Sequence, residues 1–201
     1  MVRCPDYDHM VSHPSAPSFV VAADSGLIAP ARQCPSPNCD ARPDDVTLDL
    51  IVIHGISLPP GEFGNGCIAS FFCNQLDPSA HPYFGEIAEL RVSAHLLVER
   101  DGSVIQFVSF LDRAWHAGVS SWQGRERCND FSIGIELEGT DELAYSAAQY
   151  ATLNTVLAAL RTAYPTLTDA AVVGHSDIAP GRKTDPGTAF DWDALQPVEG
   201  R

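Results

Sequence analysis

The chain has few basic residues, and this scarcity limits the partners that it can bind. Its 201 residues include 12 Lys and Arg against 26 Asp and Glu, so the formal net charge is −14. Nucleic acids and anionic membrane surfaces attract proteins through clustered positive charge. We therefore expect neither nucleic acid nor a membrane among its partners.

Long hydrophobic runs are also missing. No apolar stretch approaches the ~18–20 residues that span a bilayer. Near the N-terminus, the apolar residues 19–23 are too few for the core of a secretory signal. These absences predict a cytoplasmic protein.

None of the six cysteines belongs to a C-x-x-C pair. This excludes the zinc-finger and thioredoxin-type motifs that depend on such spacing. In a chain without a secretion signal, we expect reduced thiols in ordinary packing. A nucleophilic role for Cys128 finds no base nearby in the sequence.

Periodicity is absent from the first 24 residues, which are rich in Pro, Ser and Asp. Segments of this kind bury too little apolar surface to become ordered. We expect residues 1–24 to form a poorly ordered extension and residues 25–201 to form one domain, since single domains usually hold ~100–200 residues.

Several short apolar or alternating runs predict strands. These cover residues 48–53, 93–100, 103–108, 131–138 and 171–174. Asp101-Gly102, between the second and third runs, is typical of a hairpin with a type I′ turn. In residues 131–138, Ser132, Gly134, Glu136 and Glu138 occupy the polar face.

The strongest helix signal covers residues 146–163. Ser146 and Gln149 make a capping box, and Tyr145 with Tyr150 can form a hydrophobic staple. Residues 67–75 fit a shorter helix, and the Pro-rich residues 34–45 fit a loop. Strands interleaved with helices predict a mixed α/β fold, with a central mixed β-sheet flanked by α-helices.

Two histidines directly follow predicted strands, where a sheet presents side chains to a cleft. His54 follows residues 48–53, and His175 follows residues 171–174. The segment after His175 contains Asp177 and Asp185 among prolines and glycines that prevent a continuous helix, so it can loop back. Two imidazoles and one carboxylate with an open fourth position form a catalytic zinc arrangement. Spacing alone does not decide between the two aspartates.

Glu136 and Lys183 can supply the remaining groups for hydrolysis at zinc. Zinc-bound water has a pKa of about 7 and needs a base to take its proton. Glu136 stands on the polar face beside Gly134, whose missing side chain we expect to leave room for substrate. Lys183 offers a cation for the oxyanion. Each residue also fits a solvated surface charge, and the pattern alone does not choose.

Five longer segments extend this pattern. They are PSPNCDARP, HGISLPPGEFG, ELRVSAHLLVERDG, AWHAGVSSWQGRERCNDFSIGIELEGTD and GHSDIAPGRKTDPG. In this order they resemble the zinc-dependent N-acetylmuramoyl-L-alanine amidases, a family that includes phage lysozyme-type amidases and peptidoglycan recognition proteins. The resemblance covers about residues 25–195.

The resemblance implies roles for particular residues. His54, His175 and Asp185 correspond to the zinc ligands, Glu136 to the catalytic glutamate, and Lys183 to the lysine that stabilises the tetrahedral intermediate. It also implies a zinc ion in a surface groove of the mixed sheet fold.

Further residues in the same segments are expected to contact substrate. They are Arg91, Trp115, His116, Arg127 and Asn129. Arginines suit the carboxylates of a stem peptide with D-Glu and diaminopimelate. Gly55 departs from the polar residue expected after His54, and we expect this to loosen a substrate contact.

The implied reaction is hydrolysis of the amide between 1,6-anhydro-N-acetylmuramic acid and L-alanine. It would serve cell-wall recycling, lower the signal for β-lactamase induction, and be carried out by a monomer. The alternatives are a non-catalytic peptidoglycan-binding module and a general wall amidase outside the cytoplasm. A non-haem iron oxygenase, suggested by His175-Ser176-Asp177, lacks the required downstream histidine.

Overall fold

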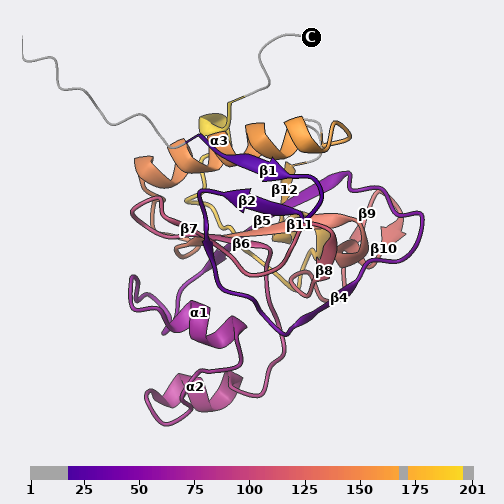
Figure 1. The fold of residues 1–201 in the computed structure, drawn as a ribbon. Coiled ribbons are helices and arrows are strands. Elements are labelled where there is room, and N and C mark those ends of the chain that lie inside the picture. The colour runs from indigo at the N-terminus through magenta and orange to yellow at the C-terminus, as the bar shows by residue number, and fades with distance from the viewer. Residues whose placement is uncertain (1–17, 168–171, 197–201) are drawn as a thin grey trace, which may run out of the picture.

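A computed structural model describes residues 18–167 and 172–196 of the chain (Figure 1). Within these residues the largest sheet has six strands in the order β12-β5-β11-β6-β7-β3. Their bounds are β3 Arg32–Gln33, β5 Leu50–Ile56, β6 Leu96–Val98, β7 Val104–Gln106, β11 Ser132–Glu138 and β12 Val172–Gly174. β12, β5, β11 and β6 are parallel, and β7 is antiparallel to β6. The expected mixed sheet is confirmed.

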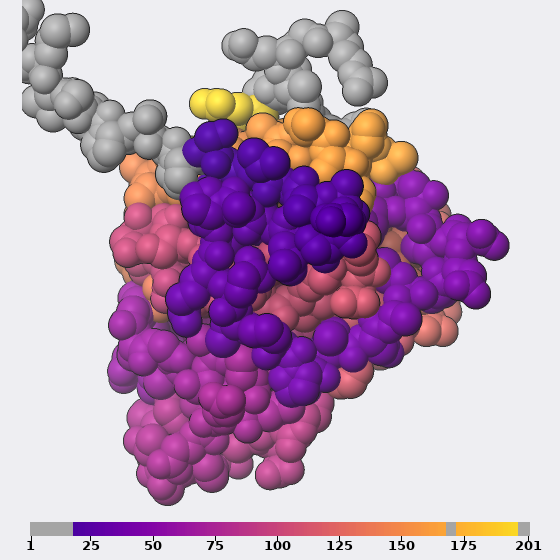
Figure 2. All heavy atoms as spheres, in the orientation of Figure 1, coloured from indigo at the N-terminus to yellow at the C-terminus, as the bar shows by residue number. Residues whose placement is uncertain are grey.

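Smaller elements surround this sheet. Antiparallel pairs form from β1 Val20–Ala22 with β2 Leu27–Ala29, β4 Cys39–Ala41 with β8 Asp112–Ala114, and β9 Ser121–Trp122 with β10 Arg125–Glu126. The α-helices are α1 Cys67–Phe72, α2 Pro82–Ile87, α3 Ala147–Ala163 and α4 His175–Ile178. Short 3₁₀ turns cover Cys128–Asp130 and Trp192–Ala194. Figure 2 shows the segment with α1 and α2 as a lobe at the lower end of the molecule.

The two longest strands are buried on both faces, and this determines where the polar side chains lie. Ile51 and Ile53 of β5 join Ile133 and Ile135 of β11 in the core that packs against α3. Because side chains alternate along a strand, His54 and Glu136 point to the opposite face. Both of these polar residues are buried there.

Helix α3 begins as the sequence predicts. Ser146 accepts a hydrogen bond from the backbone of Gln149, whose side chain accepts one from the backbone of Ser146. The rings of Tyr145 and Tyr150 lie 6.5 Å apart in the position of the staple. Local signals were sufficient here because every partner lies within one helical turn.

The β6–β7 hairpin is confirmed, but its turn is not of type I′. That type needs positive φ at both central residues, whereas Gly102 has a φ of 87° and Asp101 is not left-handed. Gly102 donates to the carbonyl of Glu99, and Glu99 donates to that of Ser103, both at 2.9 Å. The left-handed glycine also packs against α3: a Cβ there would lie 3.0 Å from the carbonyl oxygen of Ala148.

Several predictions of where elements lie differ from the structure. β5 continues past His54 to Ile56 because β11 pairs with it along its whole length. β4 lies inside the expected loop 34–45 because β8 supplies its partner. The helix predicted over 67–75 ends at Phe72, and Asn74 takes a left-handed φ of 57°. In each case pairing or backbone geometry overrode local composition.

The expected extension also differs, because β1 forms within residues 1–24 by pairing with β2. Residues 1–17 lie outside the described residues, as does the first residue of the strand predicted over 171–174. In the part of the chain that the structure describes, no helix has the length and apolar character needed to cross a membrane.

The described cysteines are free thiols, consistent with the expectation of ordinary packing. The Sγ atoms of Cys34 and Cys73 lie 3.4 Å apart, and burial raises the pKa of Cys73 to about 11. Burial also raises the pKa of Cys128, which is completely enclosed. A raised pKa keeps a thiol protonated and unreactive.

Candidate active site

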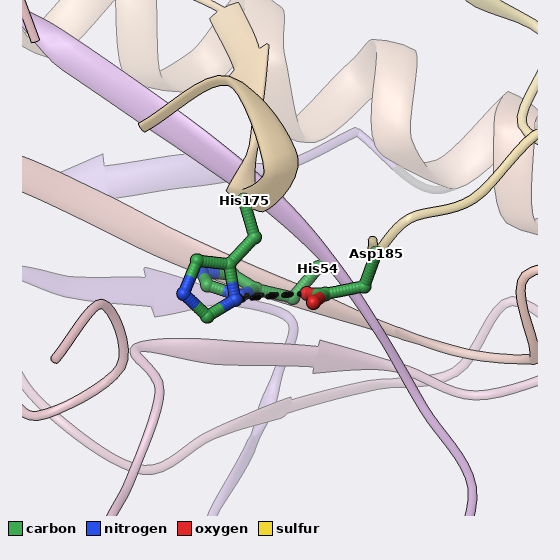
Figure 3. Close-up of side chains that lie close together, drawn as sticks. All are labelled: His54, His175 and Asp185. Atoms are coloured by element: carbon green, nitrogen blue, oxygen red, sulfur yellow. Dashed lines mark hydrogen bonds and ion pairs between the residues drawn. The ribbon is translucent and has the colours of Figure 1, made fainter. Parts of the chain in front are cut away.

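Three side chains, one of them more than 120 residues from the other two in the sequence, converge on one point (Figure 3). His54 lies on β5, His175 opens α4 directly after the neighbouring strand β12, and Asp185 follows in a loop. The Nδ1 atoms of the two histidines are 2.9 Å apart. Oδ2 of Asp185 lies 3.2 Å from Nδ1 of His54 and 3.0 Å from Nδ1 of His175.

These three atoms fit a tetrahedral metal ion. Two ligand atoms that each lie ~2.0–2.1 Å from a tetrahedral zinc are roughly 3.3 Å apart. The observed separations of 2.9–3.2 Å are close to that value. Two nitrogens and one carboxylate oxygen leave one coordination position open, as hydrolytic metal sites require. The cluster can therefore hold a metal ion.

Hydrogen bonds in the loop after β12 select Asp185 over Asp177. The backbone of Ser176 donates to the carbonyl of Asp185 at 3.0 Å, which holds the loop against the start of α4. Asp177 instead accepts a 2.7 Å bond from the backbone of Gly174 and caps its own helical turn. Asp185 therefore lies with the histidines, and Asp177 does not.

The protonation states of these groups suit metal binding. Burial lowers the pKa of His54 to about 4, against the opposing effect of Asp185. Burial alone would raise the pKa of Asp185, but its interactions with the neighbouring His175 and His54 outweigh this effect and hold that pKa below its usual range. A neutral imidazole and an ionised carboxylate are the forms that bind metal.

Glu136 stands beside this cluster. In the parallel register of β11 and β5, Glu136 lies directly opposite His54. Its Oε2 atom is buried and has no hydrogen-bond partner within the described residues. Burial raises the pKa of Glu136 well above its ordinary value, and the charge of Asp185 raises it further. A carboxylate with raised proton affinity in such a position can act as a general base and acid.

Lys183 brings positive charge to the same place. It is exposed, and its backbone donates to the carbonyl of Ala179 at 3.1 Å. Its charge lowers the pKa of both His54 and Glu136. Its positive charge therefore acts on both a candidate metal ligand and the candidate base.

Two glycines near the site leave space for side chains of the protein itself, whereas the sequence pattern related both to the substrate. A Cβ at Gly134 would overlap the ring of His116, so the space there is not free for substrate. A Cβ at Gly55 would overlap the hydroxyl of Tyr145. That hydroxyl donates to the carbonyl of Pro186, next to Asp185, at 2.9 Å. Gly55 therefore admits a tyrosine that supports the Asp185 loop.

Comparison with known proteins identifies the family. Residues 44–188 match the family described as N-acetylmuramoyl-L-alanine amidase. The chain belongs to this amidase family. It is 62% identical over 169 residues to the 1,6-anhydro-N-acetylmuramyl-L-alanine amidase AmpD of Citrobacter freundii, across 84% of this chain and 90% of that protein.

Solved structures agree with this assignment. The amidase superposes on the crystal structure of a selenomethionine AmpD derivative with a TM-score of 0.83 and 60% identity, covering 86% of this chain and 96% of that one. The TM-score is 0.53, with 25% identity, for Escherichia coli AmiD in complex with the substrate anhydro-N-acetylmuramic acid-L-Ala-D-γ-Glu-L-Lys. That match covers 88% of this chain and 63% of AmiD.

A cavity of about 520 Å³ borders α4 of the amidase. It is lined by the 118–121 segment, the end of α4 and three charged side chains. The charged residues are Glu126, Arg127 and Arg182. Arg127 pairs with Asp130 at 3.3 Å, but 70% of its side chain is exposed. Arg182 donates to the carbonyls of Ala117 and Val119.

The other expected substrate contacts lie in different surroundings. Asn129 accepts hydrogen bonds from the backbone of His116 at 3.1 Å and of Ala117 at 2.8 Å. Trp115 donates to Asp40 at 3.1 Å. Arg91 is exposed near α2 and does not line the cavity. The structure therefore brings Arg127 to the cavity, while Asn129 supports the backbone.

One structural residue of the site was missed by the sequence reasoning. The Arg42 side chain donates to the carbonyls of Phe110, Asn129, Asp130 and Ser132. It thereby fixes the backbone that enters β11, ahead of Glu136. The only signal in the sequence was an arginine within the Pro-rich segment 35–43. Its four partners are 68–90 residues further along the chain, so the neighbouring sequence could not predict them.

Proposed function

We propose that this protein uses zinc to hydrolyse the amide between 1,6-anhydro-N-acetylmuramic acid and L-alanine in muropeptides. The observation that carries the proposal is the His54–His175–Asp185 cluster with the unpartnered carboxylate of Glu136 beside it. The names of the relatives support the substrate class, as does the AmiD complex with an anhydro-muramyl peptide.

In this reaction the chain's own residues handle protons and charge. Zinc, bound by His54, His175 and Asp185, would supply Lewis-acid polarisation and a more acidic water. Glu136 takes the proton of the attacking water and delivers it to the leaving amine, a task suited by its raised pKa. Lys183 directs its ammonium charge at the developing oxyanion.

We assign the peptide end of the substrate to the surface around the α4 cavity. Arg127, which is largely exposed although it pairs with Asp130, would bind a stem-peptide carboxylate there, and Arg91 and Trp115 extend the candidate surface. His116 and Asn129 are assigned a supporting role, because both are held in contacts within the protein.

In the cell, we place this activity in the cytoplasm, in a monomeric enzyme of cell-wall recycling. Removal of anhydro-muropeptides would lower the signal that induces β-lactamase in bacteria with that circuit. The proposal predicts that nucleic acids and membranes are not partners, in keeping with a net charge of −14.

The decisive experiment is mass-spectrometric turnover of anhydro-muramyl tripeptide beside its non-anhydro counterpart. We expect release of tripeptide from the anhydro form, loss of this activity with a zinc chelator, and recovery on adding zinc. Equal or faster cleavage of the non-anhydro form would indicate a general wall amidase. Binding without cleavage by zinc-loaded protein would indicate a peptidoglycan-binding module.

A further inference from the structure

A chain of hydrogen bonds leads away from His54 on the side opposite the cluster. Nε2 of His54 lies 2.9 Å from Nδ1 of His116. Nε2 of His116 lies 3.1 Å from the hydroxyl of Ser132, which donates to the carbonyl of Cys128 at 2.6 Å. The two imidazoles meet edge to face, with ring centres 5.0 Å apart.

The end of this chain determines the direction of each hydrogen bond. The Cys128 carbonyl can only accept, so the Ser132 hydroxyl gives its proton to that carbonyl. Ser132 then accepts from Nε2–H of His116, and an uncharged His116 keeps an acceptor at Nδ1. His54 must therefore carry its proton on Nε2, which leaves the Nδ1 lone pair directed at His175 and Asp185.

An uncharged His116 also agrees with its surroundings. A buried charge is costly unless it is paired. Among the described residues, the His116 ring is hydrogen-bonded to His54 and Ser132 and to no carboxylate. His175, the other histidine of the cluster, has the same tautomer. Its Nε2 lies 3.2 Å from the carbonyl of Ala117, which can only accept a hydrogen bond. The proton of His175 is therefore on Nε2, and the lone pair of Nδ1 is available to a metal ion.

Two further features hold the His116 ring in place. Gly134, the residue two before Glu136, provides the space for the ring, because any Cβ there would overlap it. Asn129 holds the backbone of His116 and of the next residue, Ala117. The position of the ring on the sheet is therefore fixed by β11 and by the turn before it.

We infer that His116 is a positioning residue that, with Ser132, holds His54 in the tautomer that presents Nδ1 to the metal. This inference rests on the proposed metal site and adds to it a determinant of metal affinity. Partners that orient a metal-bound histidine typically contribute about 10–100-fold to metal affinity.

Two substitutions separate orientation from simple packing. H116F keeps an aromatic ring over Gly134 but removes the acceptor, whereas H116N loses the ring but keeps an acceptor near the Nδ1 position. If His116 orients His54, H116F should bind zinc about 10–100-fold more weakly, and H116N should stay close to the wild type. If His116 only fills space, H116F should bind zinc like the wild type and H116N should bind it more weakly. That result would overturn the inference.

Zinc affinity should be measured on metal-free protein by competition with a chromogenic chelator. H81F is the matched control, because His81 caps α2 and lies outside the hydrogen-bond chain. Should H116F fail to fold, S132A removes the terminal hydroxyl with a smaller change in volume. We expect S132A to weaken zinc binding at the lower end of the same range. An unchanged zinc affinity in S132A would contradict a role for this chain of hydrogen bonds in orienting His54.

A second measurement does not depend on the metal. Nitrogen chemical shifts of the imidazoles in the metal-free wild type should show His54 protonated on Nε2 at neutral pH. A proton on Nδ1 would overturn the inference even if zinc binds. A wild type that takes up no zinc would instead refute the proposed function, while the tautomer measurement would still decide the role of His116.

Discussion

The carboxylate of Glu136 lies opposite His54 across two parallel strands, and its Oε2 is buried without a partner in the described residues. Such an atom is costly to bury unless a substrate or water uses it. The neutral amide in E136Q would fill nearly the same volume but could neither take up nor deliver a proton in the reaction.

We expect E136Q to lose about 10²–10⁴-fold in kcat, the usual contribution of general acid–base catalysis. Zinc affinity should change little, because Glu136 is not in the ligand cluster. Steady-state kinetics with the anhydro-muramyl tripeptide and a chelator competition assay would check the two parts separately. Full activity in E136Q would remove Glu136 from the mechanism.

Lys183 allows a test of charge at a single residue, because it is the only lysine in the sequence. Acetylation removes the charge of a lysine, whereas reductive dimethylation keeps it. We expect acetylated protein to lose about 10²–10³-fold in kcat, the cost of removing one oxyanion stabiliser. Dimethylated protein should retain most of its activity.

The α-amino group reacts with the same reagents, so K183M treated in parallel serves as the control. Mass spectrometry would establish the modification at each site. Equal inactivation by acetylation and by dimethylation would mean that steric bulk, rather than charge, is responsible.

At the scale of the element, β11 carries both the polar face of the site and the apolar face against α3. Its seven residues are all buried, so a larger side chain on either face would meet packed neighbours. Gly134 is tightly constrained, because the His116 ring fills the space that a Cβ there would take.

G134A should destabilise the protein by about 1–3 kcal/mol, the usual cost of overpacking a filled core. It should also weaken zinc binding, since the displaced His116 no longer orients His54. G85A is the matched control: a Cβ at Gly85 in α2 meets only the Pro78 carbonyl, at 3.8 Å. Urea unfolding of both variants would test this. If G134A were as stable as the wild type, the His116 ring would move aside at no cost, and the prediction would be wrong.

For the whole molecule, the internal histidines make stability depend on pH. Burial lowers the pKa of His95 and His116 well below the ordinary value, and that of His54 to about 4. Glu136 acts in the opposite direction because its pKa is raised. The three histidines outnumber it.

Each lowered histidine pKa adds stability above the unfolded-state pKa of about 6.5, and this stability is lost as the pH falls below it. Below that pH, each such histidine contributes a slope of about 1.4 kcal/mol per pH unit. We expect metal-free protein to be less stable in urea at pH 5.5 than at pH 7.5. H95N should reduce the difference, since His95 accepts a bond from Gly134 through Nδ1, which Asn can also accept. Equal stability at the two pH values would contradict the prediction.

Much of the architecture followed from local sequence. The alternation in residues 131–138 and the capping box at Ser146 depend on neighbours a few residues away, so short patterns identified β11 and α3. The same holds for the residue types of the site. Two histidines after apolar runs, with an aspartate in a Pro/Gly-rich loop, predicted a metal-binding arrangement before any contact was known.

Only the tertiary structure decided which atoms meet. Spacing left Asp177 and Asp185 equivalent, and the hydrogen bonds within the loop after β12 separated them. The packing of the His116 ring against Gly134 depends on how β11 lies against the turn that follows β8. Local sequence could not determine these outcomes, because strand register and loop closure join residues far apart in the chain, and each contact depends on the packing of the rest.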